Sequence, residues 1–267
     1  METDPDAGIV YLVGSGPGDP DLLTVKATRL LEEADVILHD KLPGPKIIDS
    51  LPEDRREDVG KRAGGERTPQ SAINERLVEL AREGKTVVRL KGGDSFVFGR
   101  GGEEAEYLAE HGIAFEVVPA VTSAIAAPAV AGIPVTHRDH ASSVSFVTGH
   151  EDPTKEESSV DWEALAATGG TIVVLMGVGR LPDYTAALLE AGMAPETPVA
   201  LIERGTWPGQ RVATGTLETI VGVRDEEDIS PPAVTVIGYV AATRETVAAF
   251  LENEYEDERE GAEGERE

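Results

Sequence analysis

The sequence lacks cysteine and any long hydrophobic run, and it is short of basic residues. Without cysteine, this 267-residue chain has no disulfide, no thiolate ligand for a metal and no cysteine nucleophile. No apolar run approaches the roughly 20 residues that span a bilayer, and no charged start precedes a hydrophobic signal segment. These absences predict a soluble, cytoplasmic protein with no membrane partner.

Basic residues are outnumbered about twofold: 24 Lys and Arg stand against 50 Asp and Glu, for a formal net charge of −26. A nucleic-acid-binding protein needs a basic footprint, and none stands out, so no nucleic-acid partner is expected. The ordinary interpretation is a solvated acidic surface. A sharper hypothesis is adaptation to high salt, where the self-repulsion of such a surface is screened.

Short apolar runs alternate with segments of helical periodicity, which favours an α/β fold with a largely parallel first sheet. In the first half we expect strands at 8–16, 35–40, 85–94 and 113–123, and helices at 19–34, 68–84 and 99–112. Asp19-Pro20 is a suitable start for the first helix. The pattern begins again at 143–150, with helices expected at 161–169 and 180–192 and a buried strand at 170–177.

The restart of the pattern predicts two α/β domains that meet near Pro134–Ser143. We expect an N-terminal extension at 1–8, an N-terminal domain at 9–137, a C-terminal domain at 138–251 and a tail at 252–267. The tail is mostly Glu, Asp, Arg and Gly. It has too little apolar surface to offset the entropy of ordering, so the sequence predicts a disordered acidic tail.

Glycine and polar residues recur where the expected strands end. They are Gly14–Asp19, His39-Asp40, Gly92–Asp94, Thr122-Ser123 and Met176-Gly177. Each alone is ordinary turn chemistry, but ligands of open α/β sheets gather outside the carboxyl ends of strands. Together they predict an active-site cleft between the two domains.

The first of these turns, "GSGPGD", differs from the dinucleotide fingerprint G-x-G-x-x-G. Pro17 removes a backbone donor, and Asp19 adds negative charge where a phosphate would lie. Both features argue against a phosphate cradle. A nucleoside ligand without phosphates, or the edge of an anionic substrate, fits this turn better.

Metal and hydrolase sites have little support. Among the five histidines, His137 and His140 have helix-like spacing, but they lie in a proline-bounded linker without a third ligand nearby. No G-x-S-x-G elbow is present. No metal is expected.

Several segments together resemble the tetrapyrrole (precorrin) methyltransferase family. They are "VYLVGSGPGDPDLLTVKATRLLEEADVILHDKL", "VGKRAG", "RLKGGDSFVFGRGGEE", "VTSAIAAPAVAGIPVTHR", "VVLMG", "GQRVATGTL" and "PAVTVIG". The resemblance covers about Ile9 to Tyr239. The glycine turn alone marks only the superfamily, whereas "VGKRAG", "KGGDSFVFGRGGEE" and "AGIPVTHR" point to the branch that acts on uroporphyrinogen III.

The resemblance implies two α/β domains of the tetrapyrrole methylase type, a cofactor cleft between them and a homodimer. It implies transfer of two methyl groups from S-adenosylmethionine to carbons 2 and 7 of uroporphyrinogen III, with S-adenosylhomocysteine as by-product. The product would be precorrin-2, from which sirohaem and cobalamin are made.

Site residues follow from the same resemblance. Asp40 matches the proton acceptor of the family and Lys61 its proton donor. The cofactor-binding positions are Pro17, Gly92, Gly93, Asp94, Val97, Thr122, Ser123, Met176, Gly205 and Ala233. Two positions depart from the family: Ser95 replaces a proline, which loosens the loop, and His39 replaces a tyrosine, which could alter substrate binding.

The substrate carries eight carboxylates, so an acidic chain must concentrate cations at its site. Arg62, Arg100, Arg138 and Lys41 are expected to bind it, and Lys91, His137 and Arg211 are further candidates.

Plainer interpretations remain open. Asp94 could be a turn cap, Met176 a core residue, Asp40 a helix cap or an ion-pair partner of Lys41, and Lys61 a carboxylate ligand. At the level of function, the alternatives are a family member acting on a later precorrin and a catalytically silent S-adenosylmethionine-binding regulatory protein.

Overall fold

The computed structural model describes residues 6–60, 68–149, 160–251 and 255. The chain divides into two compact units, Met1–Ser123 and Ala124–Glu267. Each unit has its own sheet, as the repeated α/β pattern predicts, and each sheet has five strands.

The first unit is built on a fully parallel sheet of order β3-β2-β4-β1-β5. Its strands are β1 Ile9–Gly14, β2 Val36–His39, β3 Arg56–Asp58, β4 Thr86–Lys91 and β5 Ala114–Val118. The carboxyl ends of parallel strands lie at one edge of a sheet, so the loops after β1, β2, β4 and β5 share that edge.

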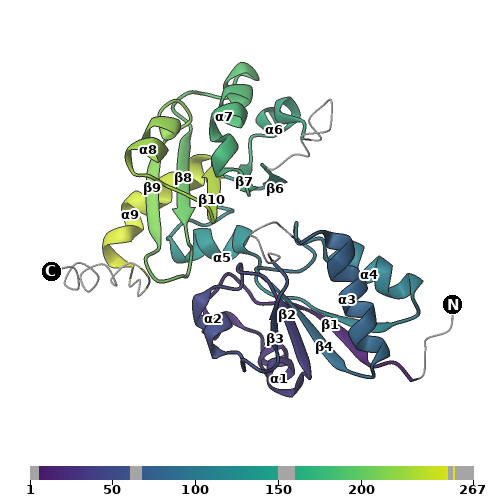
Figure 1. The fold of residues 1–267 in the computed structure, drawn as a ribbon. Helices are drawn as coiled ribbons and strands as arrows, with labels where there is room; N and C mark the ends of the chain where they lie inside the picture. Colours follow the sequence, from purple (N-terminus) through teal and green to yellow (C-terminus); the bar gives the residue numbers. More distant parts are fainter. Residues whose placement is uncertain (1–5, 61–67, 150–159, 252–254, 256–267) are drawn as a thin grey trace. The chain divides into compact units, whose positions relative to one another are not determined.

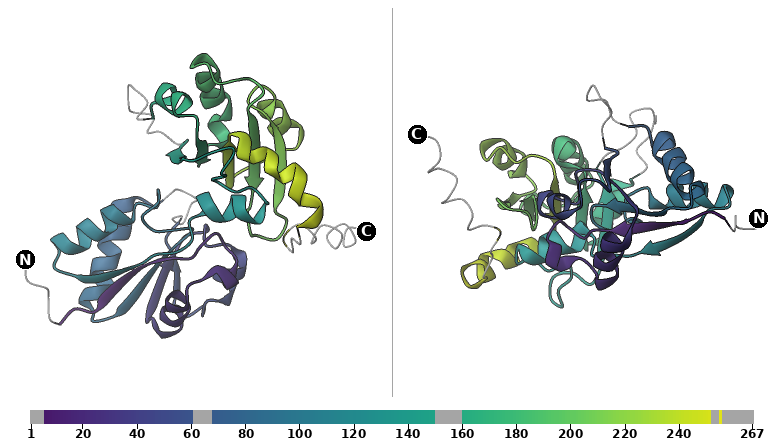
Figure 2. Two further views of the ribbon diagram at one scale, coloured as in Figure 1. Left: turned by 180° about the vertical axis from the view of Figure 1, so that it is seen from behind. Right: turned by 60° about the horizontal axis from the view of Figure 1, so that its bottom comes forward.

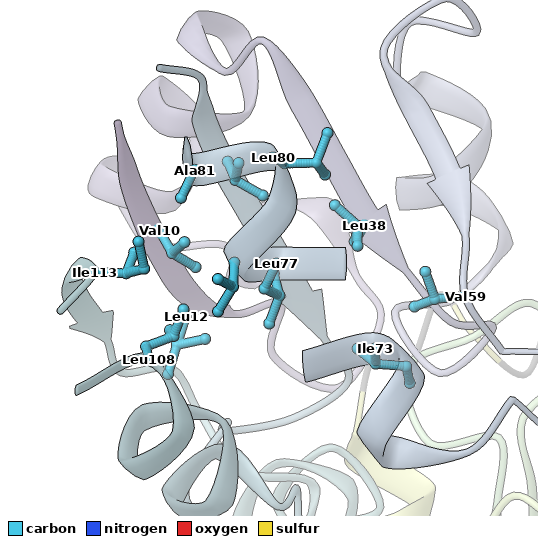
Figure 3. Packing of buried hydrophobic residues seen from close by; sticks show 12 residues of the cluster. Val10, Leu12, Leu38, Val59, Ile73, Leu77, Leu80, Ala81, Leu108 and Ile113 are labelled. Atoms are coloured by element: carbon cyan, nitrogen blue, oxygen red, sulfur yellow. The ribbon is translucent and has the colours of Figure 1, made fainter. Parts of the chain in front are cut away.

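Helices cover both faces of this sheet (Figure 1). They are α1 Val25–Glu33, α2 Pro45–Ser50, α3 Gln70–Arg82 and α4 Gly101–Glu110, and η1 Pro20–Leu22 is a 3₁₀ turn. Successive strand residues point to opposite faces: Leu38 packs with Leu77 of α3, and Ile37 packs with Leu30 of α1. Figure 3 shows the first of these two cores, in which Val10 and Leu12 of β1 meet Leu108 and Ile113.

The first helix begins later than the sequence suggests. Asp19 does accept a hydrogen bond from the Asp21 amide (2.9 Å), but this caps only the 3₁₀ turn Pro20–Leu22. Thr24 then caps α1 by accepting from the Ala27 amide at 3.1 Å. The expected helix at 19–34 is therefore a turn and a helix with separate N-caps.

The second unit has a mixed sheet of order β6-β7-β10-β8-β9. The strands are β6 Val144–Thr148, β7 Thr171–Leu175, β8 Pro198–Glu203, β9 Arg211–Thr216 and β10 Ala233–Ile237. Of its neighbouring pairs, β6–β7 is parallel, and β7–β10, β10–β8 and β8–β9 are antiparallel. Consequently β7 and β8 end at the edge where β10 begins.

Helices of the second unit are α5 Ser123–Val130, α6 Trp162–Thr168, α7 Leu181–Glu190, α8 Ile220–Glu226 and α9 Thr243–Val247, with 3₁₀ turns η2 Val178–Arg180, η3 Tyr239–Ala242 and η4 Ala248–Phe250. Leu181 and Leu188 of α7 and Ile220 of α8 pack against the sheet. In the view from behind, the yellow segment that contains α9 lies in front of the strands (Figure 2).

The division at 123/124 differs from the expected boundary at 137/138 because α5 packs within the second unit. A Cβ on Gly205 would lie 2.5 Å from the Ala127 Cβ, and Arg244 donates to the Ala131 carbonyl at 2.7 Å. Within the described ranges, no helix is both long and apolar enough to cross a membrane.

Candidate active site

Two glycine-containing loops are joined at the carboxyl edge of the first sheet. The Gly16 amide donates to the Gly93 carbonyl at 3.1 Å, and the Gly93 amide donates back to the Gly16 carbonyl at 2.7 Å. Ser15 adds a third bond from its amide to the Lys91 carbonyl at 2.8 Å. The predicted cofactor residues Gly92 and Gly93 are thus held beside the turn that contains Pro17.

Close backbone approach explains two of these glycines. A Cβ on Gly14 would lie 2.6 Å from the Gly93 carbonyl oxygen, and one on Gly92 would lie 2.5 Å from the Leu42 Cβ. Real Cβ atoms essentially never come within 3.0 Å of a non-bonded heavy atom of another part of the chain. Larger residues would therefore separate the loop after β4 from the loops after β1 and β2.

Asp94 ties the loop after β4 to the loop after β5. Its Oδ1 accepts from the Phe96 amide at 2.8 Å, which is the turn cap considered above. Its Oδ2 accepts from the Ala120 amide at 2.9 Å, two residues before Thr122. Each oxygen retains a lone pair, so this structural role leaves room for a ligand hydrogen bond.

The predicted proton acceptor lies at the end of β2. Asp40 Oδ1 accepts from the Leu42 amide at 2.9 Å, and its Oδ2 lies 3.6 Å from Nη2 of Arg89. The ion-pair partner of Asp40 is therefore a strand residue, and Lys41 is exposed. His39 is buried, and its Nδ1 lies 2.9 Å from the Asp40 carbonyl oxygen, so this departure from the family supports the local backbone.

The other predicted residues of the first unit lie on the same loops. Val97 and Ser123 are partly exposed and Thr122 is nearly buried. Arg100 has a left-handed backbone (φ 59°), and its guanidinium donates twice to the Glu103 carboxylate, at 2.8 and 2.7 Å. Lys61 and Arg62 lie outside the described residues.

Three predicted cofactor residues of the second unit meet at one edge of its sheet. Leu175 pairs with Val234, which places Met176 opposite Ala233. Ala233 also pairs with Glu203 of β8, two residues before Gly205. Met176 is 52 % exposed with φ 57°, which excludes the alternative that it is a core side chain.

The segment around Gly205 is strained and closely packed. Arg204 and Thr206 both have positive φ angles, 50° and 71°, which are unusual for residues with a Cβ. The Thr206 hydroxyl is buried and has no hydrogen-bond partner among the described residues. Such features gather at functional sites, and here they coincide with a predicted cofactor position.

Two predicted cations of the second unit have different surroundings. Arg138 is exposed. Arg211 is ion-paired with the buried Glu203 and donates to the carbonyls of Glu227 and Asp228, both at 2.7 Å. Arg211 therefore stabilises the fold and is a poor candidate for substrate binding.

A buried ionic cluster lies next to Asp40, and the sequence pointed to only one of its members, Lys91. Glu104 is fully buried and accepts on Oε1 from Arg89 Nε and Lys91 Nζ, both at 3.1 Å. Burial, helped by the neighbouring Arg89, lowers the pKa of Lys91. The available signal was a charged residue within the apolar run of a buried strand.

The chemistry available at these edges is that of glycine-lined backbone, hydrogen-bond acceptors and the carboxylates of Asp40 and Asp94. In the part of the chain that the structure describes, no group of three or more His, Asp or Glu residues could hold a metal ion. The edge of the first sheet offers acceptor oxygens without a phosphate cradle, which suits a cationic or neutral nucleoside ligand.

Comparison with known proteins places the chain among enzymes of one kind. The sequence profile described as Tetrapyrrole (Corrin/Porphyrin) Methylases matches residues 9–221. An S-adenosyl-L-methionine-dependent uroporphyrinogen III methyltransferase of Methanosarcina barkeri is 60 % identical over 234 residues, which are 87 % of this chain and 92 % of that protein.

Two further relatives extend the comparison. The solved structure of uroporphyrin-III C-methyltransferase from Thermus thermophilus in complex with S-adenosylhomocysteine is 41 % identical, has a TM-score of 0.75, and is matched over 87 % of this chain and 98 % of that one. A sirohaem synthase of Chromobacterium violaceum is 49 % identical over 93 % of this chain. The match covers only 53 % of the synthase, so this chain spans about half its length.

Proposed function

The chain belongs to the tetrapyrrole (corrin/porphyrin) methylases, and on that premise we propose that it is an S-adenosylmethionine-dependent C-methyltransferase of uroporphyrinogen III. It methylates carbons 2 and 7 and yields precorrin-2, a precursor for sirohaem and cobalamin. The observation that carries this proposal is the 60 % identity to a methyltransferase of that name along nearly the full length of both proteins.

S-adenosylmethionine, when bound, supplies the methyl group from a sulfonium centre and brings no phosphate to the site. The loops fit such a group because Gly14 and Gly92 allow close backbone approach, Gly93 adopts a φ of 67°, and Asp94 has acceptor capacity left. We assign its binding to Pro17, Gly92, Gly93, Asp94, Val97, Thr122 and Ser123 in the first unit, and to Met176, Gly205 and Ala233 in the second.

Asp40 is our proposed general base. Methylation of a pyrrole carbon leaves a proton that must be removed, and a carboxylate at a strand end can accept it. The Leu42 amide donates to Oδ1 of Asp40, and the Arg89 guanidinium lies 3.6 Å from Oδ2. Lys61 is the proposed proton donor by resemblance.

The substrate polycarboxylate needs cations on a chain of net charge −26. We assign this task to Lys41, Arg62, Arg100 and Arg138, of which Lys41, Arg100 and Arg138 are exposed. Without substrate, the Arg100 guanidinium is paired with the Glu103 carboxylate, so a substrate carboxylate must compete with Glu103 to bind it. We also propose that the protein forms a homodimer, that it lies in the cytoplasm and that its acidic surface is adapted to high salt.

The test is methyl transfer from labelled S-adenosylmethionine to uroporphyrinogen III, with Asp40→Asn beside the wild type. The expected result is transfer by the wild type and a fall of about 10²- to 10⁴-fold in the rate for Asp40→Asn. Transfer only to a later precorrin would favour another activity of the family. Binding of S-adenosylmethionine without transfer to any tetrapyrrole would favour a silent regulatory protein.

Lys61 is tested in the same assay by Lys61→Met, with Lys85→Met as the matched control. Lys85 pairs with Glu83 at 2.6 Å, just before β4 and away from the carboxyl edge of the sheet. We expect a lower rate for Lys61→Met alone. Equal rates in both variants would remove Lys61 from the proposed mechanism.

A further inference from the structure

Glu104 is the centre of a buried ionic cluster in the first unit. Its Oε1 accepts from Gln70 Nε2 at 3.0 Å and from Arg89 Nε and Lys91 Nζ at 3.1 Å. Its Oε2 is buried without a hydrogen-bond partner among the described residues. The cluster thus joins α3, α4 and β4 behind the carboxyl edge of the sheet.

Every nitrogen of the Arg89 side chain has a partner. Nε donates to Glu104, and Nη1 donates to the carbonyls of Leu90 (3.0 Å) and Leu38 (3.4 Å). Nη2 lies 3.6 Å from Oδ2 of Asp40. The side chain is only 3 % exposed, so its planar guanidinium has one well-defined orientation.

The stability of the fold alone is a weak explanation for burying Arg89 and Glu104 as an ion pair. Arg89 lies in the middle of a parallel sheet, in register with Leu12 and Leu38 on either side. Buried ion pairs generally contribute no more than well-packed apolar residues of the same volume would. The cluster does offer one thing that apolar residues could not, which is a fixed cation beside the Asp40 carboxylate.

The Asp40 carboxylate is held from two directions. The Leu42 amide binds Oδ1 from the loop after β2, and Arg89 faces Oδ2 from β4. Asp40 remains 26 % exposed at its side chain, so it can still meet a ligand. A base that is fixed in orientation loses less rate to misalignment than one that rotates freely.

We propose that Arg89, itself held by Glu104, is a positioning residue that fixes the Asp40 carboxylate for proton removal. The proposal rests on the function proposed above. Lys91 supports it from the same strand, because its Nζ donates to the same Glu104 oxygen at 3.1 Å and so helps to hold Glu104 beside Arg89.

A double-mutant cycle on methyl transfer tests the proposal, with Arg89→Met, Asp40→Asn and the double variant. We expect Arg89→Met to lower kcat on the order of 10- to 100-fold and to change KM for S-adenosylmethionine little. In the Asp40→Asn background, Arg89→Met should lower kcat no further, because its effect passes through Asp40. If kcat of the double variant falls by the product of the two single-variant factors, the proposal is wrong.

Arg55→Met is the matched control, because Arg55 binds the carbonyls of Glu32 and Ala34 (both 2.8 Å) at the opposite end of β2. It should leave kcat unchanged. Arg89→Lys keeps the positive charge but lacks the planar guanidinium. If Arg89→Met does not bind S-adenosylhomocysteine by calorimetry, Arg89→Lys replaces it in the cycle. We expect an intermediate kcat for Arg89→Lys.

The cycle also separates the two proposals from each other. If the wild type is active and the two single-variant losses of kcat multiply in the double variant, only the role of Arg89 is overturned. A wild type without methyl transfer overturns the proposed function and the role of Arg89 together. An Asp40→Asn variant with wild-type kcat removes Asp40 as the base, and the role of Arg89 is overturned with it.

Discussion

Gly92→Ala is expected to damage the site through the loop that carries Asp40. The added Cβ would lie 2.5 Å from the Leu42 Cβ and 2.8 Å from the Leu42 backbone carbon and oxygen. Ordinary contact begins at 3.4 Å, so the loop must move by 3.4 − 2.5, or about 0.9 Å. Backbone atoms cannot turn aside as the end of a flexible side chain can.

The movement reaches Asp40 because its Oδ1 is bonded to the Leu42 amide. A misplacement of about 1 Å costs on the order of 10²-fold in rate, and overpacking costs about 1–3 kcal/mol of unfolding free energy. We therefore expect Gly92→Ala to lower kcat by about that factor. Urea unfolding followed by far-UV circular dichroism, together with steady-state methyl transfer, measures both effects.

Gly102→Ala is the matched control in the same unit. Gly102 lies in α4, and a Cβ there would meet nothing within 4 Å. Replacing a helical glycine by alanine should stabilise the fold by about 0.5–1 kcal/mol and leave kcat unchanged. If Gly92→Ala behaved like Gly102→Ala in both measurements, the close approach of the two loops would have no functional importance.

Three further predictions concern stability. Tyr184→Phe removes the hydrogen bond to Thr235 Oγ1 (2.9 Å) and should lower the unfolding free energy by about 1 kcal/mol at neutral pH. Burial raises the pKa of Tyr184, so the stability that its neutral hydroxyl contributes is complete below the pKa of an unfolded tyrosine, about 10, and is lost as pH rises above that value. The difference in unfolding free energy between wild type and Tyr184→Phe, followed by the fluorescence of the adjacent Trp162, should therefore shrink above about pH 10. A difference that stays constant with pH would contradict this prediction. The Ser95 hydroxyl is buried without a partner among the described residues, so Ser95→Ala should raise the unfolding free energy by about 1 kcal/mol in urea titrations. Ser15→Ala, in contrast, loses the 3.1 Å hydrogen bond to the Gly16 carbonyl and should lower the unfolding free energy. A change of the same sign in both variants would refute this reasoning. Finally, a net charge of −26 predicts a Tm that rises from low to molar salt, and a flat Tm would count against adaptation to salt.

Much of the fold could be predicted because the buried strands are short apolar runs that end in glycine or polar residues. Gly14, His39 and Lys91 end their strands at the edge where the sequence placed the site. The convergence of Met176 and Ala233 followed from resemblance alone, since the antiparallel β10 between β7 and β8 gives no signal in composition or periodicity.

Other elements could not be predicted, for physical reasons. The helix α5 is rich in alanine and contains Pro128, so it shows no amphipathic period, and β3 has only three residues. The pairing of Arg89 with Glu104 depends on how α4 packs against β4, which local sequence does not determine. The start of α1 was misplaced because Asp19 and Thr24 are both good N-caps.

Mass spectrometry of the tetrapyrrole after incubation with the purified protein and S-adenosylmethionine shows whether this chain methylates uroporphyrinogen III. We expect a product that carries two added methyl groups, with S-adenosylhomocysteine formed in matching amount. Unmodified uroporphyrinogen III after incubation with a folded, S-adenosylhomocysteine-binding protein would contradict this expectation.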